Sequence, residues 1–226
     1  MISVVIPTYN EEGVVGKCIR ALREERTNCE IIVADGGSSD GTAEEVMSFQ
    51  DILMVQSRKG RGPQLNAGAA AARGEILLFL HADTILEKGW SSDILSACGQ
   101  DGVVGGAFTL KIDCRGGRYR LTEHWVRLRC RLFSVPYGDQ GIFLKSDVFR
   151  KLGGYEEIPI MEDVEIIGRM KSLGRIVILK RNAYVSARKW TKEGWFRTSV
   201  RNQFIMLMYR FGVTPHYLAR IYYRGQ

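Results

Sequence analysis

Acidic side chains follow three apolar runs in this sequence. They are Asp35 after residues 31–34, Asp83 after residues 76–82, and Glu162 with Asp163 after residues 158–161. Each run is predicted to be a buried strand, and open α/β proteins bind their ligands at the carboxyl ends of parallel strands. A carboxylate placed there loses hydration unless a cation, a base or a hydroxyl meets it. The pattern predicts a site for a metal ion and for a polar substrate that carries phosphate.

Two polar turns follow the first two predicted strands. Pro7 is expected to end the first strand, because proline cannot continue a central ladder, and Asn10 fits the N-cap of the next helix. The second turn, DGGSSDGT at residues 35–42, exposes N–H groups that suit an anion or a polar base. Asp35 at its start is interpreted as an acceptor for base or ribose donors, and a well-capped turn is the alternative.

A basic loop contains Arg58, Lys59 and Arg61. Its two glycines do not complete a dinucleotide fingerprint, because Leu65 stands where the third glycine is required, and the sequence contains no P-loop. The three cations suit a diphosphate. A solvated basic loop explains them equally well.

His81 and Asp83 end the most apolar predicted strand. A carboxylate with few protein ligands around it suits Mg²⁺ or Mn²⁺ shared with substrate phosphates, and His81 is a candidate second ligand. Glu162 and Asp163 begin a predicted helix, where the helix dipole stabilises carboxylates. The functional alternative makes Asp163 a general base that takes a proton from a hydroxyl.

Strand and helix patterns alternate through the first hundred or so residues that position these groups. The predicted strands cover residues 2–6, 29–34, 52–55 and 76–80, and the predicted helices cover residues 15–22, 43–49 and 64–72. Repeated βα units with short connections predict a mostly parallel central sheet flanked by helices.

The pattern changes in the second half of the chain. We expect strands at residues 103–104, 107–110 and 176–179, and a turn that enters a strand over residues 138–144. We expect helices at residues 119–133, 163–173 and 195–223. Gly174 fits the C′ position after the second of these helices. The last helix has an apolar face made of Phe196, Val200, Phe204, Leu207, Met208 and Phe211. Core packing is the default explanation for this face, and adsorption to anionic lipid is the alternative.

Size and charge restrict the class of protein. The chain has 226 residues, 45% of them apolar, which suits one large α/β domain or one domain with an appendage. Its net charge is +7, and basic residues concentrate at residues 115–131 and 180–224. Such a surplus fits phosphates, an anionic membrane or nucleic acid. Nucleic acid is not the expected partner, because no reader motif accompanies the charge.

Cysteine usage and the amino terminus predict a cytoplasmic protein. The five cysteines are odd in number and widely spaced, which disfavours a zinc site and fits a reduced compartment. A strand pattern begins at residue 2, so a signal peptide is not expected. No apolar run reaches the roughly 18–20 residues that span a bilayer.

Five motifs in order resemble the family 2 glycosyltransferases of the GT-A fold. They are IPTYNE at residues 6–11, DGGSSDGT at 35–42, NAG at 66–68, FLHAD at 79–83 and MED at 161–163. The sequence departs from the family pattern in two places. His81 replaces the first acid of the Asp-x-Asp motif, and the Gln-x-x-Arg-Trp motif of processive relatives is missing. The resemblance therefore implies transfer of a single sugar.

The resemblance also implies a role for each matching position. Asp163 would be the catalytic base of an inverting transfer with Glu162 beside it, and Asp83, with His81 as a candidate, would bind Mn²⁺ or Mg²⁺. Acceptor-side residues would be Gly138, Asp139 and Gln140. The nucleotide-sugar site would contain Pro7, Thr8, Tyr9, Glu11, Asp35, Gly36, Ser38, Asp40, Arg58, Lys59, Arg61, Gln64, Asn66, His81, Ala82 and Asp83.

These observations predict one GT-A domain over residues 1–190 and an amphipathic helical tail over residues 191–226. Residues 1–105 would bind the nucleotide sugar, and residues 106–190 would form the acceptor side. The expected donor is a UDP-sugar and the acceptor is a hydroxyl, with a lipid-linked acceptor and contact with the inner face of the membrane left open. The alternatives are a binding protein that has lost catalysis, because of His81, and a sugar-phosphate nucleotidyltransferase.

Overall fold

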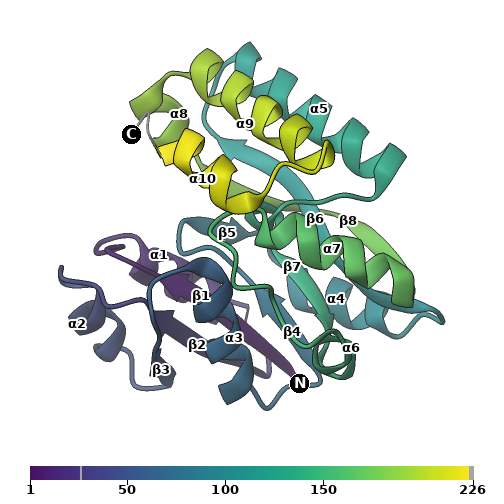
Figure 1. The fold of residues 1–226 in the computed structure, drawn as a ribbon. Coiled ribbons are helices and arrows are strands. Elements are labelled where there is room, and N and C mark those ends of the chain that lie inside the picture. Colours follow the sequence, from purple (N-terminus) through teal and green to yellow (C-terminus); the bar gives the residue numbers. More distant parts are fainter. Residues whose placement is uncertain (26, 224–226) are drawn as a thin grey trace.

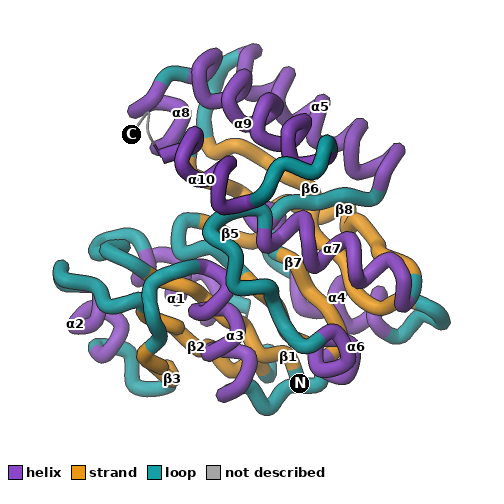
Figure 2. The backbone as a smooth tube through the Cα atoms, in the orientation of Figure 1, coloured by secondary structure: helices purple, strands orange, loops and turns teal. Residues whose placement is uncertain are grey.

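One twisted sheet runs through the protein, and helices cover both of its faces (Figure 1). The computed structural model describes residues 1–25 and 27–223, so residues 224–226 of the predicted tail lie outside the described part. Figure 2 shows that the strands occupy the middle of the molecule, with a separate group of helices at the top of the view.

The first half of the chain forms parallel strands joined by helices, as predicted. The strands are β1 (Ile2–Thr8), β2 (Cys29–Asp35), β3 (Ile52–Gln56) and β4 (Ile76–Phe79), and the helices are α1 (Val15–Arg23), α2 (Thr42–Met47) and α3 (Arg61–Ala71). All neighbouring pairs among these four strands are parallel. Their carboxyl ends therefore meet at one edge of the sheet.

The second half adds strands of mixed direction. Its strands are β5 (Thr84–Leu86), β6 (Val103–Asp113), β7 (Ile142–Lys145) and β8 (Arg175–Ser186). Its helices are α4 (Trp90–Cys98), α5 (Gly117–Phe133), α6 (Ser146–Leu152), α7 (Glu162–Leu173), α8 (Arg188–Glu193), α9 (Trp195–Arg210) and α10 (Pro215–Tyr223), with a 3₁₀ turn η1 (Gly138–Gln140). The strand order is β3-β2-β1-β4-β7-β6-β8-β5, and four of its seven neighbouring pairs are parallel.

Both faces of the sheet are buried. Ile2, Val4 and Ile6 of β1 belong to a core cluster with residues of α1 and α4, whereas Val5 belongs to a second cluster with residues of α6 and α7. Alternate residues of a strand point to opposite faces. Burial on both faces explains why the sequence of these strands is apolar throughout.

Pro7 lies inside β1, so the predicted end of the first strand is wrong. Pro7 pairs with Ala34 of β2, whereas the pairing of β1 with β4 ends at Val5 opposite Phe79. The carbonyl of Val5 accepts from Leu80, so alternate residues of β1 direct their backbone groups toward β4. The nitrogen of Pro7 faces that side beyond the last pair, and its missing N–H breaks no ladder bond.

The apolar run before Glu162 is a loop, and its prediction as a strand is wrong. Residues 158–161 have no regular structure, and Met161 has a left-handed φ of 71°. Ile160 packs against Ile205 of α9 and Leu218 of α10. The apolar residues therefore reflect burial under the C-terminal helices rather than a strand.

The predicted helix over residues 195–223 is two helices, α9 and α10. The chain turns between them at Gly212, where φ is 82°. Core packing is also wrong for most of the predicted apolar face, because five of its residues are 46% to 78% exposed: Phe196, Val200, Phe204, Leu207 and Phe211. In the part of the chain that the structure describes, no helix is both long and apolar enough to cross a membrane.

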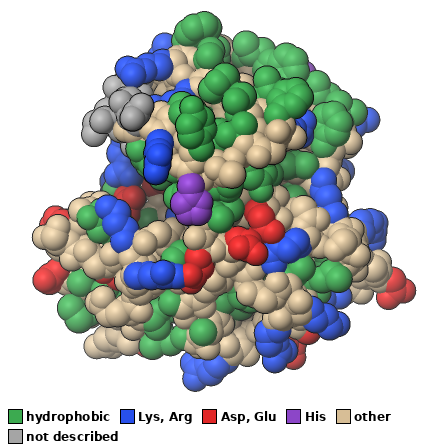
Figure 3. All heavy atoms as spheres, viewed as in Figure 1, with side chains coloured by type: hydrophobic (Ala, Val, Ile, Leu, Met, Phe, Trp, Pro, Cys, Tyr) green, Lys and Arg blue, Asp and Glu red, His purple; other side chains and the backbone are tan. Residues whose placement is uncertain are grey.

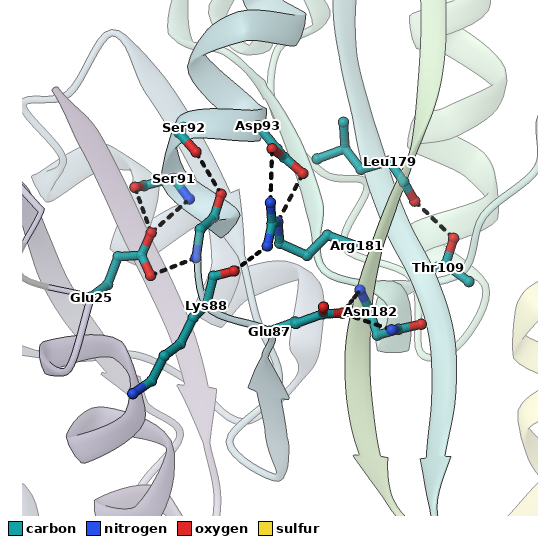
Figure 4. Close-up of polar contacts among 11 residues, drawn as sticks. Glu25, Glu87, Lys88, Ser91, Ser92, Asp93, Thr109, Leu179, Arg181 and Asn182 are labelled. Carbon is teal, nitrogen blue, oxygen red and sulfur yellow. Dashed lines mark hydrogen bonds and ion pairs between the residues drawn. The ribbon is translucent and has the colours of Figure 1, made fainter.

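A group of hydrogen bonds and ion pairs connects α4 to β8 near the β5 edge of the sheet (Figure 4). Arg181 of β8 binds the carboxylate of Asp93 through two nitrogens, at 2.9 and 3.3 Å. Glu25, which follows α1, accepts from the N–H of Gly89 at 2.8 Å. These bonds hold α4 and β5 in place, and β5 begins directly after Asp83. Gly174 directly follows the last residue of α7, as predicted, but its φ of 165° is extended and not the left-handed conformation typical of a C′ glycine.

Candidate active site

Polar residues gather where β1, β2 and β4 end. Thr8 and Asp35 are the last residues of neighbouring strands and are paired in register. β4 leads within four residues to His81 and Asp83. Because β1, β2 and β4 are parallel, the loops after them lie at the same edge of the sheet, which is the edge where open α/β folds bind ligands.

Asp35 is 2% exposed, and the chain itself supplies four donors to its carboxylate. The N–H groups of Gly37 and Ser38 donate at 2.9 and 2.8 Å, and the hydroxyls of Ser38 and Thr8 donate at 2.5 and 3.1 Å. A carboxylate has about four acceptor sites. Asp35 therefore holds the turn after β2 in shape, and its contact with a nucleotide stays a prediction.

Two predicted ligand-binding amides are also bonded within the protein. Gln64 is buried, and its Nε2 donates to the carbonyls of Thr8 at 2.6 Å and Ala34 at 3.0 Å. Asn66 exchanges two hydrogen bonds with the backbone of Tyr155, at 2.9 and 2.8 Å. Both residues lie on α3. They tie this helix to the ends of β1 and β2 and to the loop before α7.

The loops after β1 and β2 are fastened together. Asn10 does not cap a helix, because α1 begins at Val15, and the N–H of Asn10 donates to Ser38 Oγ at 2.9 Å instead. Asp40 accepts from the side chain and the N–H of Thr42. The side-chain bond from Thr42 is the main cause that lowers the pKa of Asp40. The two loops therefore form one rigid rim.

An exposed tyrosine of this rim contacts a lysine of the loop between β3 and α3. Lys59 Nζ is 3.8 Å from the centroid of the Tyr9 ring, and Tyr9 is 38% exposed. Arg58 is paired with Glu157. An accessible aromatic face next to cations can stack on a nucleobase while the cations meet phosphate.

Glu162 is 2% exposed and pairs with Arg61 at 3.3 Å. Burial raises the pKa of Glu162, and the charge of Arg61 opposes that rise. The Arg61 side chain is 57% exposed, so it connects this buried acid to the surface of the cleft. Glu162 is therefore the charge partner that positions Arg61 beside Asp163.

Asp163 contacts the turn that the sequence analysis assigns to the acceptor side. Its Oδ2 accepts from the N–H of Gly138 at 2.6 Å, and its Oδ1 accepts from the N–H of Val164 at 2.8 Å. A Cβ atom at position 138 would lie 3.1 Å from His81 Nε2 and 3.3 Å from Asp163 Oδ2. Glycine at this position lets η1 approach both side chains closely, so His81 and Asp163 border the same small space.

The charges of Glu11 and Arg188 act on Asp83 in opposite directions. Burial and the charge of Glu11 raise its pKa, and Arg188 opposes that rise. Arg188 Nη2 is 2.9 Å from Glu11 Oε2. Ala82, before Asp83, packs in the core. A carboxylate with a raised pKa gains from a cation, and in the described structure Arg188 supplies part of that charge.

Asp139 joins the acidic residues of the cleft. Burial raises its pKa to about 6, Arg129 opposes that rise, and Asp163 and Asp83 add to it. Two of the three predicted acidic sites, Asp83 and Asp163, thus act electrostatically on one side chain. Both acids are thus close enough to Asp139 to affect its pKa, and their common role in one cleft stays a prediction.

Gln140 holds the turn η1 through buried hydrogen bonds. It is 1% exposed, and its Nε2 donates to the carbonyl of Phe108 at 2.8 Å. Its Oε1 accepts from Arg129 at 3.3 Å and from the N–H of Tyr137 at 3.2 Å. Arg129 also lies 3.4 Å from the centroid of the Tyr137 ring. Gln140 therefore shapes the acceptor-side turn, and contact with an acceptor stays a prediction.

Sequence reasoning missed Arg188, Arg129 and Tyr137 as members of the site. Arg188 is 177 residues from its partner Glu11, so no local pattern connects them. Arg129 lies in a helix with many arginines, where nothing in the sequence distinguishes it. The available signal for Arg188 is the short apolar run at residues 183–185, which comes shortly before it in the sequence.

The donor set suits a cation that is shared with a substrate. Among the described residues, no group of three or more His, Cys, Asp or Glu side chains could hold a metal ion by itself. Mg²⁺ is commonly bound through one or two carboxylates together with substrate phosphates and water. Asp83, with its raised pKa, fits such a role, and a site built from protein ligands alone does not fit.

A family model described as Glycosyl transferase family 2 matches residues 3–155. The chain belongs to this family. It is 26% identical to the probable glycosyltransferase YdaM of Bacillus subtilis (strain 168), over 92% of this chain and 56% of that protein. This family 2 chain therefore spans about half the length of that relative.

Solved structures of glycosyltransferases share the fold. Mannosyltransferase PcManGT from Pyrobaculum calidifontis, in complex with GDP-Man and Mn²⁺, matches with a TM-score of 0.68 at 17% identity, over 99% of this chain and 70% of that one. S. aureus TarS in complex with UDP-GlcNAc matches with a TM-score of 0.64 at 18% identity, over 82% and 58%. These matches confirm the predicted GT-A type of α/β fold.

Proposed function

We propose that this protein transfers one sugar from a nucleotide-diphosphate sugar to a hydroxyl acceptor, with inversion at the anomeric carbon. The observation that carries the proposal is the convergence of Asp163, His81 and Gly138 beside the end of β4. The convergence brings a carboxylate that can take a proton next to the predicted metal-binding residues. Family membership supports the same activity.

The donor would lie along the rim formed by the loops after β1 and β2. Tyr9 would stack on the base, and Lys59 and Arg61 would face the diphosphate. Related folds support this placement, because TarS and PcManGT were solved with UDP-GlcNAc and GDP-Man. The TarS complex supports the predicted UDP-sugar, whereas the PcManGT complex contains a GDP-sugar. Which nucleobase this chain binds would depend on the side chains of the rim.

Mn²⁺ or Mg²⁺ would be held by Asp83, with His81 as the second candidate. When bound, the cation would neutralise charge that develops on the departing diphosphate. PcManGT was solved with Mn²⁺, which supports a divalent cation for this chain. Arg188 and Asp83 attract each other electrostatically, and Arg188 would help to neutralise charge near the diphosphate.

Asp163 would act as the general base. The acceptor oxygen forms a bond to the anomeric carbon while the bond from that carbon to the diphosphate oxygen breaks, and the acceptor proton moves to the Asp163 carboxylate. The bonds from the N–H groups of Gly138 and Val164 fix the carboxylate. They occupy about half of its four acceptor sites, so a hydroxyl can still bind.

Calorimetry and donor hydrolysis test the proposal together. The full chain is titrated with UDP, GDP, CDP and dTDP, with and without Mn²⁺, and then incubated with the sugar donors of the nucleotide that binds. We expect binding that strengthens with Mn²⁺, followed by slow release of the nucleoside diphosphate. Binding without any turnover would support a non-catalytic binding protein instead, and release of pyrophosphate from a nucleoside triphosphate would support a nucleotidyltransferase.

A further inference from the structure

Two helices of the C-terminal half, α5 and α9, each expose a line of apolar side chains. On α9 and the residue directly after it these are Phe196, Val200, Phe204, Leu207 and Phe211, and on α5 they are Leu121, Trp125, Leu128 and Leu132. Successive members are three or four residues apart, which places each set on one side of its helix. The α9 residues are 46% to 78% exposed and the α5 residues are 36% to 62% exposed.

The two helices lie side by side and run in the same direction. Trp195 at the start of α9 donates from its indole to Thr122 of α5 at 2.9 Å. Arg210 at the end of α9 lies 5.7 Å from the ring of Phe133 at the end of α5. Figures 1 and 2 show the same arrangement at the top of the molecule. We call the two exposed apolar lines together the α5–α9 surface.

Both lines point away from the protein. On α5 the buried residues Tyr119, Glu123 and Cys130 occupy the opposite side of the helix from Trp125. On α9 the buried Ile205 likewise lies across the helix from the exposed line. Figure 3 shows green side chains gathered over the upper part of the molecule, with blue ones among them. The exposed residues therefore form one patch rather than scattered positions, and such patches mark interaction surfaces.

The charge around this patch is almost entirely positive. Three of the five arginines of α5 are exposed, namely Arg118, Arg127 and Arg131. Arg120 pairs with Glu123, the one acidic residue of α5, which is 3% exposed, and Arg129 contacts Gln140. Residues 195–223, which include α9 and α10, carry no Asp or Glu. Three of their four arginines are exposed, and the fourth, Arg201, lies 4.6 Å from the centroid of the Tyr222 ring. On the described parts of these helices, exposed apolar residues thus lie beside arginines and no exposed acid, which is complementary to a bilayer with an apolar interior and anionic headgroups.

We propose that the α5–α9 surface docks the protein on an anionic lipid bilayer. Aromatic and aliphatic side chains would enter the boundary between headgroups and acyl chains, and the arginines would bind the lipid phosphates. This inference concerns binding alone and holds independently of the transferase activity. Membrane binding would explain why the apolar residues of α9 are exposed, which core packing does not explain.

The position of the patch agrees with an acceptor held in the membrane. α5 ends at Phe133, five residues before Gly138, whose N–H donates to Asp163. Five residues span at most about 18 Å of extended chain. A bilayer on the α5–α9 surface would therefore lie close to the acceptor side of the cleft, within reach of a hydroxyl on a lipid headgroup.

A second copy of this chain fits the patch less well than a bilayer does. A symmetric contact would place the same arginines of both copies against each other, and like charges at an interface oppose association. Nucleic acid would satisfy the arginines but would leave the apolar line on the two helices exposed. Anionic lipid satisfies both features of the surface.

Vesicle flotation of the full chain tests the proposal, without donor or metal present. Wild-type protein is mixed with phosphatidylcholine vesicles that do or do not contain phosphatidylglycerol, at low and high salt. The apolar variant is Trp125→Ser with Phe196→Ser, and its control is Met47→Ser with Leu53→Ser, two exposed residues outside the patch. The charge variant is Arg127→Gln with Arg131→Gln, and its control is Lys17→Gln with Lys180→Gln.

We expect the wild type and both controls to float with the anionic vesicles. The apolar variant and the charge variant should each bind about tenfold or more weakly, with unchanged circular dichroism and donor affinity. High salt should weaken binding of the wild type. Equal binding to neutral vesicles, or equal binding of all variants, overturns the proposal. Dimerisation that only the apolar variant loses, without vesicle binding, assigns the surface to a second copy.

Discussion

The two sides of the cleft use polar residues in different ways. On the donor side, Asp35 and Gln64 are buried and their side chains are bonded to the protein itself. Around the predicted metal site and the acceptor-side turn, Asp83 and Asp139 have raised pKa values because burial and neighbouring acids disfavour their charge. Buried polar residues thus stabilise the fold on the donor side, whereas the other acids of the cleft lie where their ionised form is disfavoured.

This difference distinguishes residues that stabilise the fold from residues that take part in binding or catalysis. A buried polar group with all its hydrogen bonds stabilises one conformation. A group of carboxylates that raise one another's pKa gains free energy when a cation or a proton arrives. Substitutions on the donor side should therefore change stability first, and substitutions on the acceptor side should change activity or pH dependence first.

Asp163→Asn should have the largest effect. An amide cannot take the acceptor proton, so transfer should fall about 10²–10⁴-fold while donor affinity remains. Initial rates and calorimetry on the same preparation measure both quantities. The matched control is Asp147→Asn, which changes an acid in the first turn of α6 in place of α7. Equal rates for Asp163→Asn and wild type would exclude Asp163 as the base.

Gln64→Leu should mainly affect stability. It leaves the buried carbonyls of Thr8 and Ala34 without their donor, which should lower the free energy of unfolding by about 2–4 kcal/mol. Denaturant titration measures this change. Gln50→Leu, at an exposed position, should change stability by less than about 0.5 kcal/mol. A large loss of donor affinity with unchanged stability would instead assign Gln64 to the nucleotide.

Asp139→Asn should stabilise the protein at neutral pH. The pKa of Asp139 is about 6 in the folded protein against an ordinary value of 3.8, so the folded state binds more protons between these values and wild-type stability falls as pH rises through them. The variant avoids this loss. Its advantage should grow between about pH 4 and 6 and reach about 1–3 kcal/mol above that range. An advantage that is the same at pH 4 and pH 8 would contradict the raised pKa.

Arg188→Gln should have the smallest effect on stability. Its ion pair with Glu11 is partly exposed, so the free energy of unfolding should fall by less than about 1 kcal/mol. Loss of the positive charge should raise the pKa of Asp83 further. When the pH is lowered, Asp83 should therefore become protonated sooner, and Mn²⁺-dependent donor binding should be lost at a higher pH than in wild type. Arg23→Gln, which breaks the exposed pair with Asp51, is the control and should leave that pH dependence unchanged.

The sequence by itself determined the local elements and the motifs on them. Apolar runs predicted β1, β2, β3 and β4 because strands buried on both faces need continuous hydrophobic residues. The motifs placed Asp83 and Asp163 correctly, after β4 and at the start of α7. These features depend on neighbouring residues, and neighbouring residues are what a sequence pattern records.

Only the tertiary structure decided which distant groups meet and which apolar faces are covered. Arg188 pairs with Glu11 across 177 residues, and the loop over residues 158–161 is apolar because α9 and α10 cover it. The line from Phe196 to Phe211 has the spacing of a buried helix face, yet it is exposed. Periodicity shows that a face is apolar, whereas burial depends on whether another part of the chain packs against it.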